Sequence, residues 1–473
     1  MAEDRIRAKD FLLGKIRSGE SLTRGQQIRL SLMLSLPAII AQLSSIAMQY
    51  IDTSMIGHLS SQAGASIALV STCLWLLGGF CFACCSGFSV QVAHFVGADD
   101  FKAARSVVRQ ALLSSLVWSG GFAVLGLSVA HVLPFWLGGT EEIAADASKY
   151  FFITCLFIPI RQLNFMAASL LQCSGNMKVP SALNIGMCFL DVVFNYIFIY
   201  VLGMGVTGAA VGTGVAESLT AVAMLAFLLF GSRELRITLD GKSSFIPTRD
   251  VLSRAFRIGM PMCLENIVMR GAYIAGTVIV APLGTIAIAA NGFAVTAESL
   301  CYMPGYGIAD AATTLVGQSL GAGRKDLANR LGWMNTFLGM ALMSIMGILM
   351  YIFAPQMMSI LSPDPEIIGL GAEVLRIEAF AETMYAASIV AYGVCVGAGD
   401  TLVPSIMNFG SMWIFRIVPA IFLTPLLGLK GYWIAMAFEL NVRGIIFLAR
   451  LKSKRWARGG NLAAGDKAAT AEE

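Results

Sequence analysis

Charged residues are scarce in this sequence, and histidine is nearly missing. Lys, Arg, Asp and Glu make up 13 % of the 473 residues, whereas soluble domains usually carry about a quarter. Hydrophobic residues make up 57 %, the mean hydropathy is +0.73, and 48 glycines suit close packing of helices in a bilayer. This composition excludes an ordinary soluble domain and indicates an integral membrane protein.

The sequence also lacks the motifs of several enzyme classes. It contains no HExxH, no GxSxG and no phosphate-binding loop, and His58, His94 and His131 lack the spacing of metal ligands. A GxGD string at residues 397–400 precedes Pro404 and is interpreted as a turn. We therefore expect a protein that is not an enzyme, has no metal, cofactor or nucleic-acid partner, and is not driven by ATP on this chain.

A secretory signal and a disulfide framework are missing as well. The first thirty residues are charged and hold no short apolar core ahead of a cleavage site, so the first membrane helix is expected to act as its own insertion signal. The ten cysteines fall in or at the ends of apolar segments, which argues against disulfides. The pair Cys81 and Cys84 is interpreted as packing residues.

Long apolar stretches fill most of the chain, and each is long enough to cross about 30 Å of hydrocarbon as a helix. The sequence therefore predicts an all-α integral membrane protein with twelve transmembrane helices. The predicted spans are 31–57, 64–92, 107–133, 147–173, 181–202, 207–231, 255–281, 285–318, 331–354, 367–396, 405–426 and 431–450.

Basic residues occur in only one set of the connecting loops. The opposite loops, near 57–63, 134–146, 202–207, 281–285 and 355–366, contain no Lys or Arg. By the positive-inside rule both termini are expected to be cytoplasmic. The basic loops hold Lys102, Arg105, Arg109, Lys178, Arg233, Arg236, Lys242, Arg249, Arg254, Arg257, Arg324, Lys325 and Arg330.

The chain matches itself at an offset of 224 residues. This offset pairs Pro37 with Pro261, and it also pairs Gly97 with Gly321, Gly175 with Gly399, Pro180 with Pro404 and Asn184 with Asn408. An even number of helices per repeat gives parallel repeats, so we expect two six-helix bundles around a central cleft. The predicted parts are a cytoplasmic segment 1–30, lobes 31–231 and 255–450, a linker 232–254 and a cytoplasmic tail 451–473.

Acidic residues within the predicted spans of the first lobe are candidates for function, because an ionisable group costs about 2.5–3.5 kcal/mol at membrane depth. Asp52 continues a polar stripe with Ser45 and Gln49, and Asn184, Asp191 and Asn195 share one face of the fifth helix. Two such stripes can face each other and bind a proton or a small cation. The alternatives are that Asp52 lies in interfacial water and that Asp191 makes a structural hydrogen bond. The repeat mates of the two acids, Gly276 and Phe415, cannot titrate, which favours coupling in the first lobe.

The second lobe carries charges of both signs. Glu439 and Arg443 are spaced i, i+4, which predicts a mutual ion pair. Arg416 is expected to pair with a carboxylate on helix seven, eight or ten. Glu265, four residues after Pro261, is either a substrate-binding acid or an ion-pair partner of an arginine such as Arg416. The other charges are Arg270, Glu298, Asp310, Arg376, Glu378 and Glu382.

The sequence resembles the multidrug and toxic compound extrusion (MATE) family over about residues 30–456. The matching segments are LSLPAIIAQ and YIDTSMIGHL in the first helix, QCSGNMKVPSALN before the fifth, FNYIFIYVLGMGVTGAAVGT, MPGYGIADAATTLVGQSLGAGRKD and FLARLKSKRW. The family implies two six-helix bundles around a cleft and export of cationic or amphipathic organic compounds against inward flow of protons or sodium ions. The sequence looks more similar to the bacterial branch related to DinF than to the NorM type.

The resemblance assigns roles to individual residues. Asp52 matches the acidic position of the first helix implicated in coupling, and Thr213 matches a polar position on helix six near that site. Some members carry Asn and then Asp on helix five, whereas this chain has Asp191 and then Asn195, which leaves the ion open between H+ and Na+. Glu265 is similar to an acid on helix seven in other branches, and Glu378 or Glu382 can stand in for an acid on helix ten. We expect the cleft to be lined by Gln49, Glu265, Asn291, Glu298 and Tyr302.

Three functions remain open from the sequence. The first is a cation-coupled exporter of small organic cations or amphipathic compounds, monomeric and spanning the inner membrane of a bacterium. The second is a lipid-linked oligosaccharide flippase of the same superfamily. The third is a membrane scaffold or sensor without transport, which predicts that titratable groups are fully paired with arginines.

Overall fold

The computed structural model describes residues 2–57, 59, 61–237 and 244–459. Every regular element in these ranges is helical. Tertiary contacts divide the chain into an N-terminal unit, Ser44–Met260, and a C-terminal unit, Met1–Leu43 with Pro261–Glu473. The boundary falls inside two long helices, α2 (Arg24–Gly57) and α9 (Arg249–Val280), which each contain one of the two prolines matched by the repeat. The predicted lobe limits, 31–231 and 255–450, stay a prediction.

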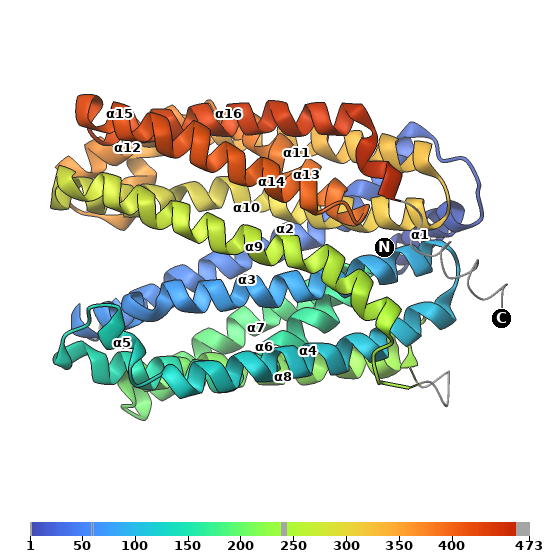
Figure 1. Ribbon diagram of the computed structural model, residues 1–473, viewed down its shortest axis with the longest axis horizontal. Helices are drawn as coiled ribbons and strands as arrows, with labels where there is room; N and C mark the ends of the chain where they lie inside the picture. The colour runs from blue at the N-terminus through green and yellow to red at the C-terminus, as the bar shows by residue number, and fades with distance from the viewer. Residues whose placement is uncertain (1, 58, 60, 238–243, 460–473) are drawn as a thin grey trace. The chain divides into compact units, whose positions relative to one another are not determined.

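Long helices form a bundle in the N-terminal unit (Figure 1), and two of them end in short π-helices. Together with residues 44–57 of α2 and residues 249–260 of α9, it contains α3 (Ser61–Gly97), α4 (Phe101–Val129), α5 (Leu133–Trp136), α6 (Glu141–Cys173), α7 (Lys178–Tyr196), η1 (Ile197–Val201), α8 (Gly205–Ala226) and η2 (Phe227–Gly231).

The C-terminal unit has a second bundle and an added helix at the N-terminus (Figure 1). Together with residues 24–43 of α2 and residues 261–280 of α9, it contains α1 (Ala2–Arg17), η4 (Ala281–Leu283), α10 (Thr285–Gly321), α11 (Lys325–Leu361), α12 (Pro365–Ala379), α13 (Glu382–Gly397), α14 (Leu402–Gly410), η5 (Ser411–Ile417), α15 (Val418–Leu427), α16 (Leu429–Ser453) and η6 (Arg455–Gly459).

The predicted membrane spans all correspond to helices. Among the described residues ten helices are long and apolar enough to cross a membrane, and α12 with α13 makes an eleventh when the bent pair is counted as one span. The twelfth predicted segment is α16, which has 25 residues and carries Glu439 and Arg443 near its middle. The predicted span 367–396 is divided between α12 and α13, which are bent by 60° relative to each other.

Hydrogen bonds from α4 hold the segment between the repeats at two points. Arg109, on α4, donates to the carbonyl oxygen of Ile237 at 2.6 Å, and the side-chain oxygen of Gln110 accepts from the backbone N–H of Thr248 at 2.8 Å. Of the predicted linker 232–254, residues 238–243 lie outside the described residues, and α9 already begins at Arg249. Residues 460–473 of the predicted tail and His58 also lie outside them.

The predicted cytoplasmic segment 1–30 contains a helix that the sequence analysis did not identify. Leu12, Leu13 and Ile16 of α1 are buried in the C-terminal unit. The guanidinium group of Arg324 donates to the carbonyl oxygen of Lys15 at 3.0 Å, at the end of this helix. The last carbonyls of a helix have no partner within the helix, so an arginine donor satisfies one of them.

Candidate functional site

Three polar side chains meet within the N-terminal unit. The side-chain amide of Asn195 donates to Oδ1 of Asp52 at 3.0 Å and to Oδ2 of Asp191 at 3.1 Å. Asp52 comes from α2, whereas Asp191 and Asn195 lie one turn apart on α7. The two N–H bonds of one amide thus join carboxylates from two helices. Asp52 and Asn195 are 143 residues apart in the sequence.

Burial separates these groups from bulk solvent. Asp191 is 1 % exposed and Asn195 is 2 % exposed, while Asp52 is partly buried. The Oδ1 atom of Asn195 has no hydrogen-bond partner among the described residues. Two neighbouring carboxylates cannot both ionise without a large electrostatic penalty, so such a pair binds a proton or a small cation. Carboxylate and amide oxygens are also the atoms that hard cations prefer.

The neighbouring helix α8 approaches this site because it carries glycines. A Cβ atom at Gly212 would overlap the Oδ1 atom of Asn195, and one at Gly208 would lie 2.7 Å from the carbonyl oxygen of Phe198. Small residues let membrane helices approach closely. The approach brings Thr213 beside Asp191, so this predicted helix-six residue lies at the site.

The chain immediately after Asn195 leaves the regular α-helix. The π-helix η1 runs from Ile197 to Val201, and the hydroxyl group of Tyr200 donates to the carbonyl oxygen of Met55 on α2 at 2.7 Å. Wide turns of this kind are rare and often occur at functional sites. Here the wide turn and the Tyr200 contact add a second link between α7 and α2, next to the carboxylate pair.

The remaining members of the two predicted stripes contribute less. Asn184 is half-buried, and no hydrogen bond in the described part of the chain joins it to Asp52, Asp191 or Asn195. Gln49 is exposed. The structure therefore brings Asp52, Asp191, Asn195 and Thr213 together, and Asn184 takes no part in the hydrogen bonds that join them.

The sequence analysis missed an ion pair in the same unit. Nε of Arg161, on α6, lies 2.8 Å from Oε1 of Glu217 on α8. The signal was available, because an arginine at the centre of one apolar span and a glutamate in another each need a partner at membrane depth.

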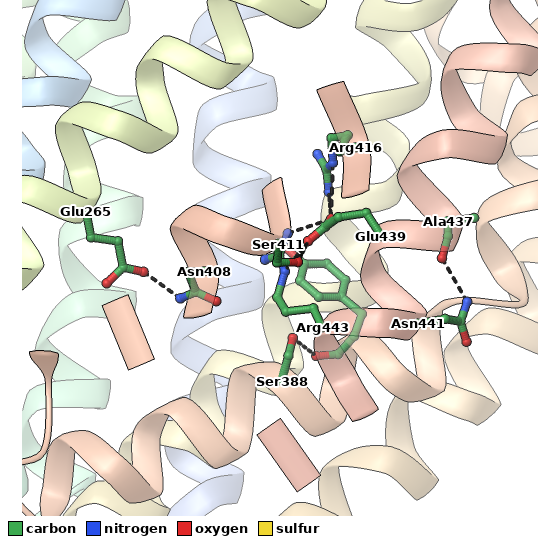
Figure 2. A network of polar contacts seen from close by, with 10 residues as sticks. Glu265, Ser388, Asn408, Ser411, Arg416, Ala437, Glu439, Asn441 and Arg443 are labelled. Carbon is green, nitrogen blue, oxygen red and sulfur yellow. Dashed lines mark hydrogen bonds and ion pairs between the residues drawn. The ribbon is translucent and has the colours of Figure 1, made fainter. Parts of the chain in front are cut away.

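The predicted Glu439–Arg443 pair in the C-terminal unit is confirmed and is part of a larger network (Figure 2). Arg443 donates from Nε to Oε1 of Glu439 at 2.6 Å, and Nη2 of Arg416 lies 2.8 Å from Oε2 of Glu439. The hydroxyl group of Ser411 also donates to Glu439. The expectation that Arg416 pairs with helix seven, eight or ten is wrong. Arg416 belongs to the π-helix η5, and it reaches α16 instead.

Glu265 is held by neutral donors rather than by an arginine. Its carboxylate accepts from the hydroxyl groups of Tyr392 and Ser405, each at 2.7 Å, and from the side-chain amide of Asn408 at 2.6 Å. Figure 2 shows the last of these contacts, between α9 and α14. The alternative of an ion pair between Glu265 and Arg416 is therefore wrong.

Other predicted residues of the C-terminal unit lie within its bundle. Asn291 accepts from the indole N–H of the buried Trp433 at 2.9 Å. Tyr302 packs against the ring of Tyr385 at 5.5 Å between centroids. Glu298, Glu378 and Glu382 are buried. The carboxylate oxygens of Glu378 and Glu382 have no hydrogen-bond partner among the described residues.

Comparison with known proteins supports one family. The family model MatE matches residues 37–197 and 261–422. The probable multidrug resistance protein NorM of Thermotoga maritima is 26 % identical over 435 residues, which cover 89 % of this chain and 92 % of that protein. The multidrug resistance protein MdtK of Yersinia enterocolitica is 25 % identical over 439 residues, 90 % of this chain and 95 % of that protein.

Solved structures share the fold. An outward-facing multidrug resistance MATE family transporter of the MOP superfamily superposes with a TM-score of 0.85 at 21 % identity, covering 92 % of this chain and 100 % of that one. A variant of the Vibrio cholerae MATE transporter VcmN gives 0.84 at 15 % identity, covering 97 % and 99 %. The family model accounts for most of the chain in two matching halves, and the chain belongs to the MatE family of membrane transporters.

Proposed function

We propose that this protein is a secondary antiporter that exports cationic or amphipathic organic compounds in exchange for H+ or Na+. The observation that carries the proposal is the amide of Asn195, which joins the carboxylates of Asp52 and Asp191 inside an apolar bundle. Multidrug resistance is the activity in the names of its relatives NorM and MdtK. The chain is a bacterial inner-membrane protein with both termini cytoplasmic, and it acts as a monomer.

The coupling step follows from the chemistry of the two acids. When both are ionised, their repulsion strains the contact between α2 and α7, and a proton or sodium ion relieves it. Since Asp52 is the α2 member of the pair, binding the ion changes how α2 packs in the N-terminal unit. This change is the event that releases substrate outward, and loss of the ion returns the protein to the inward-facing state.

The other two functions fit the observations less well. A scaffold predicts titratable groups fully paired with arginines, whereas the buried carboxylates of Glu378 and Glu382 have no hydrogen bond among the described residues. A flippase is not favoured by relatives that are named for multidrug resistance. Membership of a DinF-like branch stays a prediction, because the relatives compared here carry the names NorM and MdtK. The substrate roles of Gln49, Glu265, Asn291, Glu298 and Tyr302 also stay predictions.

The test uses purified protein in liposomes loaded with a fluorescent organic cation. A pH gradient and a sodium gradient are imposed separately on wild type, Asp52→Asn and the matched control Asp146→Asn. Asp146 is exposed and its only described ion pair is a 4.0 Å contact with Lys149. Substrate movement driven by one gradient, lost in Asp52→Asn and kept in the control, supports antiport and names the ion. Equal transport by Asp52→Asn and wild type would overturn the mechanism.

A further inference from the structure

The ion pair between Arg161, which is partly exposed, and Glu217, which is buried, lies close to the carboxylate pair but does not belong to it. Glu217 is 7 % exposed, and its Oε1 atom is 2.8 Å from Nε of Arg161. Its second oxygen, Oε2, is buried and has no hydrogen-bond partner among the described residues. A pair that served packing alone would be expected to satisfy both oxygens of the carboxylate.

Spacing along the helices connects this pair with the candidate coupling site. Glu217 follows Thr213 by four residues on α8, and Thr213 lies beside Asp191. Asp191 is within electrostatic range of both Arg161 and Glu217. The other titratable groups that face the cluster are Asp52 on α2, Cys81 on α3, and Tyr150 and Cys155 on α6.

The charges in this cluster are unequal. Among the described residues, Arg161 is the one permanent cation that acts on this cluster: it contacts Glu217 directly and lies within electrostatic range of Asp191. Glu217 is the acid in direct contact with Arg161, so the positive charge of the guanidinium group mainly compensates the negative charge of Glu217. Consequently the acids at the coupling site remain under-compensated and keep a high affinity for a proton or a small cation.

We infer that Glu217 is a positioning residue that holds Arg161 away from Asp191 and thereby sets the affinity of the coupling site for its ion. The inference rests on the proposed antiport at Asp52 and Asp191. If Glu217 loses its charge, the positive charge of Arg161 is no longer balanced by its direct partner and acts more strongly on Asp191, so the ionised form of Asp191 becomes more stable. If Arg161 loses its charge instead, one more uncompensated carboxylate faces the site, and the coupling ion binds more tightly.

The experiment measures the concentration of coupling ion that gives half-maximal substrate transport in proteoliposomes. Glu217→Gln is expected to raise this concentration at least about tenfold, because an opposite charge shifts carboxylate protonation by about 1–3 pH units. Arg161→Gln is expected to lower it. The double variant, which removes both charges, is expected to lie between the two single variants and closer to wild type.

A matched control and a conservative variant separate this role from a structural one. Asp400→Asn removes a 2.6 Å ion pair with Arg450 in the C-terminal unit and is expected to leave the half-maximal concentration unchanged. Glu217→Asp keeps the charge and is expected to preserve most of the affinity, and Arg161→Gln serves as the test if Glu217→Gln does not fold. Folded Glu217→Gln and Arg161→Gln variants that both keep the wild-type half-maximal concentration would overturn the inference. A wild type without gradient-driven transport would instead overturn the proposed function.

Discussion

Replacing Glu439 by glutamine tests whether the network in the C-terminal unit is an ion-pair network that stabilises the fold. The carboxylate is completely buried and accepts from Nε and Nη2 of Arg443, from Nε and Nη2 of Arg416, and from the hydroxyl group of Ser411. The substitution keeps the shape of the side chain and removes its charge. Two guanidinium groups, each no more than about a tenth exposed, then have lost their direct anionic partner.

The magnitude follows from this geometry. Breaking a buried ion pair costs about 3–5 kcal/mol, because the remaining charge stays desolvated. The loss at Glu439 belongs at the upper end of that range or above it, since one acid serves two arginines. The entropy of unfolding grows with chain length, so for a chain of this size about 1 kcal/mol corresponds to about 1 °C in melting temperature. We therefore expect a fall of about 3–5 °C or more.

The assay is thermal unfolding of the purified protein in detergent, followed by loss of the monodisperse peak after heating. Asp400→Asn is the control, because it removes one ion pair whose side chains are 15–16 % exposed, and we expect a fall of about 1 °C. The reasoning is refuted if Glu439→Gln melts at the wild-type temperature or no lower than the control. A variant that is not recovered from the membrane at all is consistent only with the larger loss.

Three further predictions follow from single contacts. Gly212→Ala places a methyl group against the Oδ1 atom of Asn195 and should reduce gradient-driven transport at least about tenfold. The control Gly186→Ala on α7, where a Cβ meets nothing within 4 Å, should transport like wild type. Equal transport rates for the two variants would contradict the assignment of Asn195 to the coupling site. Trp433→Phe removes the donor to Asn291 and should cost about 1 kcal/mol of stability in the same melting assay, unless that contact is absent. A fluorescent protein that matures only in the cytoplasm should fluoresce when fused to the C-terminus, and a dark fusion that is present in the membrane would reverse the predicted orientation.

The sequence predicted the helices well because hydropathy reports directly on membrane spans. The twelve apolar segments all became helical elements, and the repeat offset matched Pro37 with Pro261, each within the helix that is divided between the two units. Hydropathy carries no information on direction within a span. For that reason the 60° bend between α12 and α13 was not predicted, although each helix of the pair lies within an apolar segment.

Pairings between helices were harder to predict than the helices themselves. The Glu439–Arg443 pair is local, and i, i+4 spacing is sufficient to predict it. The partner of Arg416 depends on the rotation of its helix, which the π-helix η5 changes, so the expected partner helix was wrong. The contacts of Asn195 with Asp52 required two helices to have a particular rotation, and the polar stripes predicted this rotation only in part, since Asn184 is not among these contacts.

The balance of buried charge distinguishes a structural acid from one that can exchange an ion. Glu439 is paired with two arginines, so more positive than negative charge surrounds its carboxylate. The site around Asp191 is the opposite case, with one arginine for three carboxylates, those of Asp52, Asp191 and Glu217. An excess of carboxylates in an apolar bundle is unfavourable unless protons or cations complete it. In the proposed antiport, retaining that excess makes the packing of the site depend on the ion, and this dependence is what would let an ion gradient drive a change in helix packing.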